Sequence, residues 1–282
     1  MTGRSTTKPV VIGHVEWSQL IAANDFPATG QIVESSRWDQ FPAGGACVAA
    51  VQLAKLAGGC DFFTAVGADE WGSRSVRELE RLAVTVHAAQ RDAPTRKALV
   101  LTQPENERTI IVHGERHFPR HDDPLPWDLL SSADCALVTA ADDGVLRAAR
   151  GAGVLILTAR ALVDPLPIDV DAVVGSATDT AETLAPDLLD RVGLVVRTRG
   201  RDGGTFTSRD GSTGAFRAPP LAAPVVDTYG AGDSFAAGLT FALTRGLSDR
   251  DAVDFAARCG AAVLAAAGPY EAQLTASAFT PS

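Results

Sequence analysis

Short, continuous apolar runs alternate along the chain with longer segments that are polar on one side. Such apolar runs are typical of strands buried on both faces of a sheet. The one-sided segments, for example residues 142–153 and 178–193, are expected to be crossover helices. The five runs are residues 9–14 (PVVIGH), 135–140 (CALVTA), 154–159 (VLILTA), 172–176 (AVVGS) and 194–199 (LVVRTR). The alternation predicts an α/β fold with a doubly wound, mostly parallel sheet flanked by helices.

Two segments break this rhythm. Residues 16–41 and 96–118 alternate loosely between apolar and polar positions and contain the turn sequences PATG and PENE, which is typical of antiparallel strands. We expect them to form a small β-sheet lid; the alternative is two ordinary edge hairpins without motion. The α/β core would then consist of residues 1–15, 42–95 and 119–282.

Composition narrows the function. The formal charge of −9, with no basic cluster, argues against a nucleic-acid partner. The beginning of the chain lacks the apolar segment of a signal peptide, and no run approaches the length of a membrane span. The four cysteines have no CxxC pair and are expected to be reduced thiols. A cytoplasmic protein without a membrane partner is therefore expected.

The candidate chemistry centres on residues 225–238, VVDTYGAGDSFAAG. This stretch is neither a GxxxxGK[ST] phosphate loop nor a complete dinucleotide fingerprint. Gly230, Ala231 and Gly232 precede a helix that should begin near Asp233 and end at Gly246. A helix N-terminus after small residues offers unpaired amides to an anion. The alternative is a tight glycine turn with Asp233 as an ordinary helix cap.

The carboxylate of Asp233 distinguishes these two interpretations. A negative charge at an anion site is unfavourable unless the group serves as a base or faces a cation. Phosphoryl transfer would use both parts, because amides neutralise the moving phosphoryl group while Asp233 accepts the proton of an attacking hydroxyl.

Residues 227–238 resemble the signature of the ribokinase/phosphofructokinase-B family of sugar and nucleoside kinases. Four further stretches are similar to features of that family, in the same order: residues 24–33 (NDFPATGQIV), 44–58 (GGACVAAVQLAKLAG), 65–72 (AVGADEWG) and 198–204 (TRGRDGG). The resemblance implies a ribokinase-like α/β core with a β lid. It also implies ATP as phosphoryl donor, Mg²⁺ on its phosphates, and a hydroxyl group as acceptor.

The resemblance also assigns roles to individual residues. Asp233 would be the catalytic base, and Gly230, Ala231 and Gly232 would form the anion hole. The substrate would approach the backbone of Gly44 and Gly45. For the nucleotide side and a monovalent cation such as K⁺, the matching positions are Thr198, Gly200, Gly203 and, near the cation loop, Asp227.

Several positions depart from the family pattern. Ala49 stands where an asparagine usually binds sugar hydroxyls, and Glu16 and Ser18 replace the asparagine and aspartate after the first strand. Glu16 can still bind a hydroxyl, and Trp17 could stack on a ring or simply pack. Ser176 and Asp179 replace the family's Asn-x-x-Glu on the magnesium side, where Asp179 or Glu182 could hold the ion through water; a helix-capping charge is the alternative for both.

Other polar residues remain ambiguous. Arg108 and Arg116 lie on the expected lid, and the Arg-Thr-Ile run of Arg108 is similar to that of ketohexokinase-like members, so a ketose is the first expected acceptor. The alternative for both arginines is a solvated strand position. Asp142 or Asp143 could face the acceptor or cap the next helix. The five histidines have no ligand spacing and are interpreted as surface or packing residues.

We therefore expect an ATP-dependent kinase for a small carbohydrate. A nucleoside kinase of the same fold is one alternative, and a non-catalytic sugar or nucleotide sensor is another. The expected partners are a small sugar and, as lids pair in many members of the family, a second copy of the chain.

Overall fold

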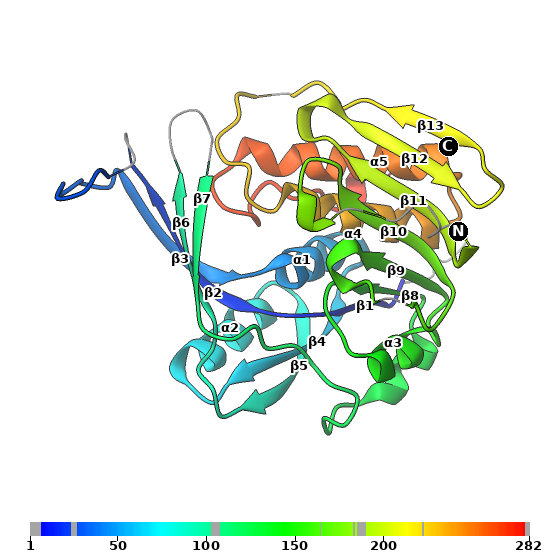
Figure 1. Ribbon diagram of the computed structural model, residues 1–282, viewed down its shortest axis with the longest axis horizontal. Helices are drawn as coiled ribbons and strands as arrows, with labels where there is room; N and C mark the ends of the chain where they lie inside the picture. The colour runs from blue at the N-terminus through cyan, green and yellow to red at the C-terminus, as the bar shows by residue number, and fades with distance from the viewer. Residues whose placement is uncertain are drawn as a thin grey trace.

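The computed structural model contains two sheets that differ in size (Figure 1). It describes residues 7–23, 27–102, 108–163, 165–182, 184, 190–221 and 223–279. The expected turn at residues 104–107 and the first three residues of the 24–33 stretch lie outside this described part, as do residues 183 and 185–189 of the helix expected within residues 178–193.

The large sheet has nine strands in the order β13-β12-β11-β10-β9-β8-β1-β4-β5. Neighbouring strands from β11 to β5 are parallel, and β12 and β13 extend the sheet as an antiparallel pair. All five predicted apolar runs lie in this sheet, and the prediction of a mostly parallel α/β fold is confirmed. The bounds are β1 Pro9–Ile12, β4 Cys60–Gly67, β5 Val84–Arg91, β8 Cys135–Val138, β9 Val154–Thr158, β10 Val170–Ser176, β11 Val192–Thr198, β12 Gly204–Ser208 and β13 Thr213–Phe216.

Helices cover both faces of this sheet. Side chains alternate along each strand, so Val11 packs in one buried cluster while Val10 and Ile12 pack in the other. Helices α1, α4 and α5 contribute to the first cluster, and α3 contributes to the second. The helices are α1 Gly45–Ala57, α2 Glu70–Glu80, α3 Asp143–Ala149, α4 Ala231–Thr244 and α5 Asp249–Ala262. This double burial explains why the strands read as continuous apolar runs.

The small sheet has four strands in the order β3-β2-β6-β7 and lies beside the core (Figure 1). Its strands are β2 Glu16–Ala22, β3 Arg37–Ala43, β6 Lys97–Thr102 and β7 Arg108–His113. The β2–β3 and β6–β7 pairs are antiparallel as expected, but β2 and β6 are parallel, so the sheet is mixed. The Trp17 ring packs 5.3 Å from that of Trp71 in α2 and links this sheet to the core.

The structure bears on two expectations from composition, the state of the cysteines and the presence of a membrane-spanning helix. The four cysteines are free and buried, as expected for reduced thiols. Within the described ranges, no helix combines the length and apolar character that crossing a membrane would require.

Candidate active site

Helix α4 begins at Ala231, two residues earlier than expected, and Gly230 is its N-cap residue. Gly230 has φ +83°, and a Cβ atom there would lie 2.8 Å from Cβ of Pro269 and 2.9 Å from Cγ1 of Val48. Only glycine tolerates this conformation and packing. Asp233 is the third residue of the helix, so the interpretation of Asp233 as the helix cap is wrong.

The N-terminus of α4 is open to a ligand. Within the described part of the chain, the amides of Ala231, Gly232 and Asp233 have no hydrogen-bond acceptor. Gly232 is exposed, and nothing lies within 4 Å of the position that a Cβ atom would take. Free amides combined with the positive end of the helix dipole can bind an anion. The three predicted anion-hole residues therefore lie together at one accessible helix end.

The carboxylate of Asp233 lies between the N-termini of two helices. A Cβ atom on Gly45, the first residue of α1, would lie 2.5 Å from Oδ1 of Asp233. Gly44 caps α1 with φ +94°, and a Cβ atom there would lie 3.0 Å from Nε2 of His14. The glycine pair thus makes room for the carboxylate on one side and for an imidazole on the other.

Burial raises the pKa of Asp233 to about 6. The guanidinium groups of Arg108 and Arg160 oppose this shift, whereas the carboxylate of Glu182 adds to it. Loss of solvation disfavours the charged form of a carboxyl group. A base with a pKa slightly below neutral is largely ionised at pH 7 and still binds a proton well, as a catalytic base requires.

Glu16 and Ser18 lie at the start of β2, and both are buried. Oε2 of Glu16 is 3.4 Å from Nε of Arg96, an ion pair. Burial raises the pKa of Glu16, while Arg96 and Arg116 lower it and Asp233 raises it further. Glu16 and Asp233 therefore belong to one electrostatic site, which also contains the glycine pair.

Arg108 connects the small sheet to the α4 end of the core. It is the first residue of β7, and its Nη1 donates to Oγ1 of Thr228 at 3.0 Å. Its guanidinium also lies 5.6 Å from the centre of the Tyr229 ring. Arg108 is exposed, but these two contacts hold its guanidinium beside the start of α4.

Asp179 and Glu182, the predicted magnesium residues, are bound to Arg160. Nε of Arg160 donates to Oε1 of Glu182 at 2.7 Å, and its Nη2 donates to Oδ2 of Asp179 at 2.5 Å. The other two oxygens accept the amides of Ser176 and Ala181. All four oxygens are occupied by protein donors, and the described residues contain no group of three or more metal-binding side chains. Direct metal binding does not fit this arrangement.

The expected nucleotide turn follows β11. Thr198 ends that strand, and Gly200 and Gly203 both have positive φ, +53° and +79°. A Cβ atom on Gly203 would overlap the carbonyl oxygen of Phe216 in β13, so glycine here also permits the sheet to extend. The role of this turn in nucleotide binding stays a prediction.

Two other predicted site residues have their carboxylate oxygens occupied by backbone amides. Oδ1 of Asp227 accepts the amide of Tyr229 and Oδ2 accepts that of Gly268. Asp142 is the N-cap of α3, accepting from Val145 and, with its other oxygen, from the amide of His121. The capping alternative is confirmed for Asp142.

Sequence reasoning missed His14 and Arg96 and undervalued Arg116. Nη2 of Arg116 donates to Nδ1 of His14 at 3.0 Å, so His14 packs beside the site and also holds Arg116. Burial, with help from the nearby arginines, holds the pKa of His14 well below its usual value. No local motif marks these residues, because they meet only when β1, β2 and the segment after β7 come together.

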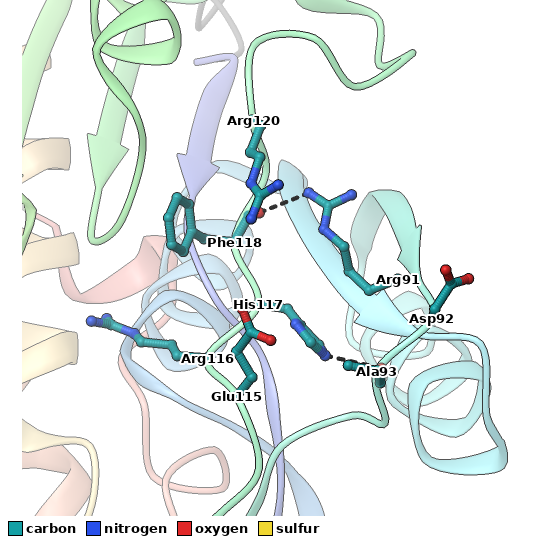
Figure 2. A pocket seen from close by; sticks show the side chains of 8 residues that line it. All are labelled: Arg91, Asp92, Ala93, Glu115, Arg116, His117, Phe118 and Arg120. Carbon is teal, nitrogen blue, oxygen red and sulfur yellow. Dashed lines mark hydrogen bonds between the residues drawn. The ribbon is translucent and has the colours of Figure 1, made fainter.

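A polar pocket of about 140 Å³ lies beside the segment that follows β7 (Figure 2). It is lined by Arg91, Asp92, Ala93, Glu115, Arg116, His117, Phe118 and Arg120. Arg91 forms a double ion pair with Asp123 at 2.7 Å. Arg116 borders this pocket, but its side chain points away from it (Figure 2). Asp233, Glu16 and the glycine pair do not line it, so the pocket is separate from the site around Asp233.

A parallel α/β core, an adjoining small sheet and an aspartate at an anion-binding helix end define the ribokinase-like class of phosphotransferases. The chain belongs to the pfkB family of carbohydrate kinases, whose family model matches residues 6–164 and 168–276. This assignment confirms the predicted family and the enzyme class of phosphotransferases with an alcohol acceptor.

Individual relatives are more distant. The bifunctional protein HldE of Halorhodospira halophila is 30% identical over 239 residues, 74% of this chain and 49% of that protein; the chain thus spans about half of this relative. The probable chloroplastic fructokinase-6 of Arabidopsis thaliana is 27% identical over 293 residues, 86% of this chain and 74% of that protein. The structure of Arabidopsis thaliana ribokinase complexed with ribose and ATP matches with a TM-score of 0.77 at 20% identity, covering 97% of each chain.

The two glycines of the anion hole should respond differently to alanine. Gly232→Ala should not lower the melting temperature, because the added methyl meets nothing in the protein, but it should weaken ATP binding about tenfold or more by crowding the helix end. Gly230→Ala should lower the free energy of unfolding by about 2–4 kcal/mol through backbone strain and overpacking. Urea unfolding and titration calorimetry measure the two effects; equal ATP affinity in wild type and Gly232→Ala would contradict this account of the helix end.

Proposed function

We propose that this protein is an ATP-dependent kinase that transfers the γ-phosphoryl group to a hydroxyl of a small carbohydrate, with a ketose as the first candidate. The observation that carries the proposal is the carboxylate of Asp233, with its pKa raised to about 6, beside the free amides of α4. Membership in the pfkB family supports the reaction class. The ribokinase complexed with ribose and ATP and the probable fructokinase support a sugar acceptor.

In the proposed reaction, Asp233 accepts the proton of the acceptor hydroxyl as its oxygen attacks the γ-phosphorus of ATP. The bond from that phosphorus to the bridging oxygen breaks, and ADP leaves with the bonding electrons. The amides of Ala231 and Gly232 stabilise negative charge on the moving phosphoryl group. Glu16 and Ser18, with the backbone of Gly44 and Gly45, form the surface that holds the acceptor in line.

The small sheet acts as a lid in this proposal. Arg108 in β7 reaches Thr228, next to the loop before α4. Closure of this sheet over the acceptor would exclude water, which otherwise competes with the sugar hydroxyl for the phosphoryl group. The four free, buried thiols support the further proposal that the protein works in the cytoplasm.

Mg²⁺ enters the proposal as the ion that accompanies the phosphates of ATP, and K⁺ enters it only through the family resemblance. Mg²⁺ supplies charge neutralisation on the phosphates of ATP. Since Arg160 occupies Asp179 and Glu182, these residues would reach the ion only through water. Asp227 shapes its loop through two backbone amides, and no step is assigned to K⁺.

Particular residues argue against the two alternative functions, a nucleoside kinase and a non-catalytic sensor. A Trp17 ring free to stack on a base would have suited a nucleoside, yet its side chain is buried between Trp71 and the guanidinium of Arg74, 4.4 Å from the ring centre. It is therefore not free to stack on a base. A non-catalytic sensor would have no use for a carboxylate with a raised pKa at an anion site.

Replacing Asp233 by asparagine should reduce kcat by about 10²- to 10⁴-fold, because the variant has no base. ATP affinity should persist, and the melting temperature should not fall, since a desolvated charge is removed. Release of ADP is followed with ATP, Mg²⁺ and a panel of ketoses, aldoses and nucleosides. Asp254→Asn, on the exposed side of α5, is the matched control and should keep full activity. Undiminished turnover in Asp233→Asn would exclude this residue as the base.

The pH dependence of kcat/KM should show an acidic limb near pH 6, where Asp233 becomes protonated in the free enzyme. Activity should fall about tenfold per pH unit below this point. Because Arg108 lowers the pKa of Asp233, Arg108→Gln should move the limb to higher pH. A limb near pH 4, or one shifted downward in the variant, would show that another group controls the rate.

We also propose that two copies of the chain pair through their small sheets. Every residue of β7, an edge strand, is exposed, and Ile110, Ile111 and Val112 are 43%, 52% and 46% accessible. Trp38 in β3 is 56% accessible. An apolar edge strand of this kind invites pairing with another strand.

Sedimentation velocity at micromolar concentration should therefore show a dimer. Ile111→Lys should shift it toward monomer, because a charge would be buried in the interface. Leu221→Lys, an equally exposed apolar position outside the small sheet, is the control and should leave the dimer intact. A wild-type monomer at high concentration would refute the pairing.

A further inference from the structure

Arg116 carries a guanidinium group that the protein surrounds with neutral partners. Its Nη2 donates to Nδ1 of His14 at 3.0 Å and to the carbonyl oxygen of Thr139 at 3.4 Å. Its Nε is buried and has no hydrogen-bond partner. Among the described residues, no carboxylate lies within ion-pair distance of Arg116.

The other three arginines of the site differ from it. Arg160 is paired with Asp179 and Glu182, and Arg96 lies beside Glu16. Arg108 is held by a threonine hydroxyl and an aromatic ring, close enough to Asp233 to lower its pKa. At the Glu16 end of the site, two guanidinium groups therefore share a single carboxylate.

A partly buried cation without an ion-pair partner is costly, and the charges around Arg116 show this cost. Burial lowers the pKa of Arg116, and the like charges of Arg96 and Arg160 lower it further, against one opposing carboxylate, Glu16. His14 gives no compensation, because its own pKa is held well below the usual value and the ring is neutral. An anion arriving from outside would relieve this imbalance.

The position of Arg116 indicates which ligand would bring that anion. It contacts His14 and Thr139, which follow β1 and β8, and ligands bind beyond the carboxyl ends of such parallel strands. Glu16 is influenced by Arg116, whereas the charges that influence Asp233 are Arg108, Glu182 and Arg160. Arg116 therefore belongs to the acceptor end of the site rather than to the anion hole for the transferred phosphoryl group.

The side chain of Arg116 is directed away from the polar pocket that its backbone borders. Figure 2 shows it on the opposite side of the 115–118 segment from Arg91. His14, which holds it, has its Nε2 near Gly44. The glycine pair thus lies between the carboxylate of Asp233 and the imidazole that holds Arg116.

We propose that the acceptor sugar carries an anionic group, a phosphate or a carboxylate, which Arg116 binds together with Arg96. The planar guanidinium fork matches either group in a bidentate geometry. The hydroxyl to be phosphorylated then lies at the other end of the molecule, against Asp233. This inference rests on the proposed kinase function, because it takes the Glu16 end as the acceptor site.

Binding tests the inference independently of turnover. The Asp233→Asn variant is saturated with ADP and Mg²⁺ and titrated by calorimetry with matched sugars: fructose, fructose 1-phosphate, fructose 6-phosphate, glucose and gluconate. The same titrations are made with Arg116→Gln and Arg116→Lys added. Arg120→Gln, an exposed arginine outside the site, is the control, and melting curves confirm that each variant is folded.

At least one anionic sugar should bind about 100-fold more tightly than its neutral counterpart, and Arg116→Gln should remove most of that difference. Arg116→Lys should restore part of this affinity difference, and Arg120→Gln should leave it unchanged. Comparison of the sugar phosphates with gluconate identifies whether the anionic group is a phosphate or a carboxylate. Equal binding of neutral and anionic sugars, or equal loss of both in Arg116→Gln, would overturn the inference. So would a loss confined to ATP affinity, which would assign Arg116 to the nucleotide.

These experiments can refute the inference about Arg116 without refuting the proposed kinase function, and the converse also holds. Tight, Arg116-dependent binding of an anionic sugar that wild-type protein never phosphorylates would leave this inference standing and refute the kinase reaction. Phosphorylation of neutral sugars at undiminished kcat/KM in Arg116→Gln would support the kinase reaction and refute this inference.

Discussion

The site depends on one carboxylate, Asp233, held where two helices begin. Helix α1 starts at Gly45 and α4 at Ala231, and the missing side chain at Gly45 makes the space that Oδ1 of Asp233 occupies. Two helix N-termini attract anions, yet burial raises the pKa of Asp233 to about 6. The desolvation cost thus exceeds the favourable local field, and the group is left with the proton affinity of a base.

The large sheet sets this geometry. Because β1 and β8 are neighbouring parallel strands, the segments that follow them lie at the same edge of the sheet, which brings His14 and Thr139 near the start of α1. The small sheet adds residues from the other direction, Glu16 at the start of β2 and Arg108 at the start of β7. In the proposed reaction, the core would supply the base and the anion hole, and the small sheet would supply groups that face the acceptor.

Features that depend on local sequence were predictable. The stretch at residues 227–238 contains both the small residues that open the helix end and the aspartate behind them, so the family and the reaction class follow from it. The apolar runs predicted five strands of the large sheet because double burial leaves no polar face. Asp142 could not be assigned from sequence alone, since capping and substrate binding need the same residue after a strand.

Features that depend on long-range contacts were not predictable. Arg116 and His14 are 102 positions apart and meet through a single hydrogen bond. Arg96 precedes β6 and reaches Glu16 because β2 and β6 pair in parallel. Trp17 resembled a stacking platform for a base, but Trp71 and Arg74 cover it. The residues proposed to select the acceptor are thus placed by strand pairing rather than by a motif.

The most direct test of this account is a carbon NMR titration of the Asp233 carboxyl group, assigned by its absence in Asp233→Asn. The account predicts a pKa of about 6 in the free protein, raised further when Arg108 is replaced by glutamine. A pKa near 4, the ordinary value for aspartate, would show that the carboxylate is well solvated and would contradict its role as the base.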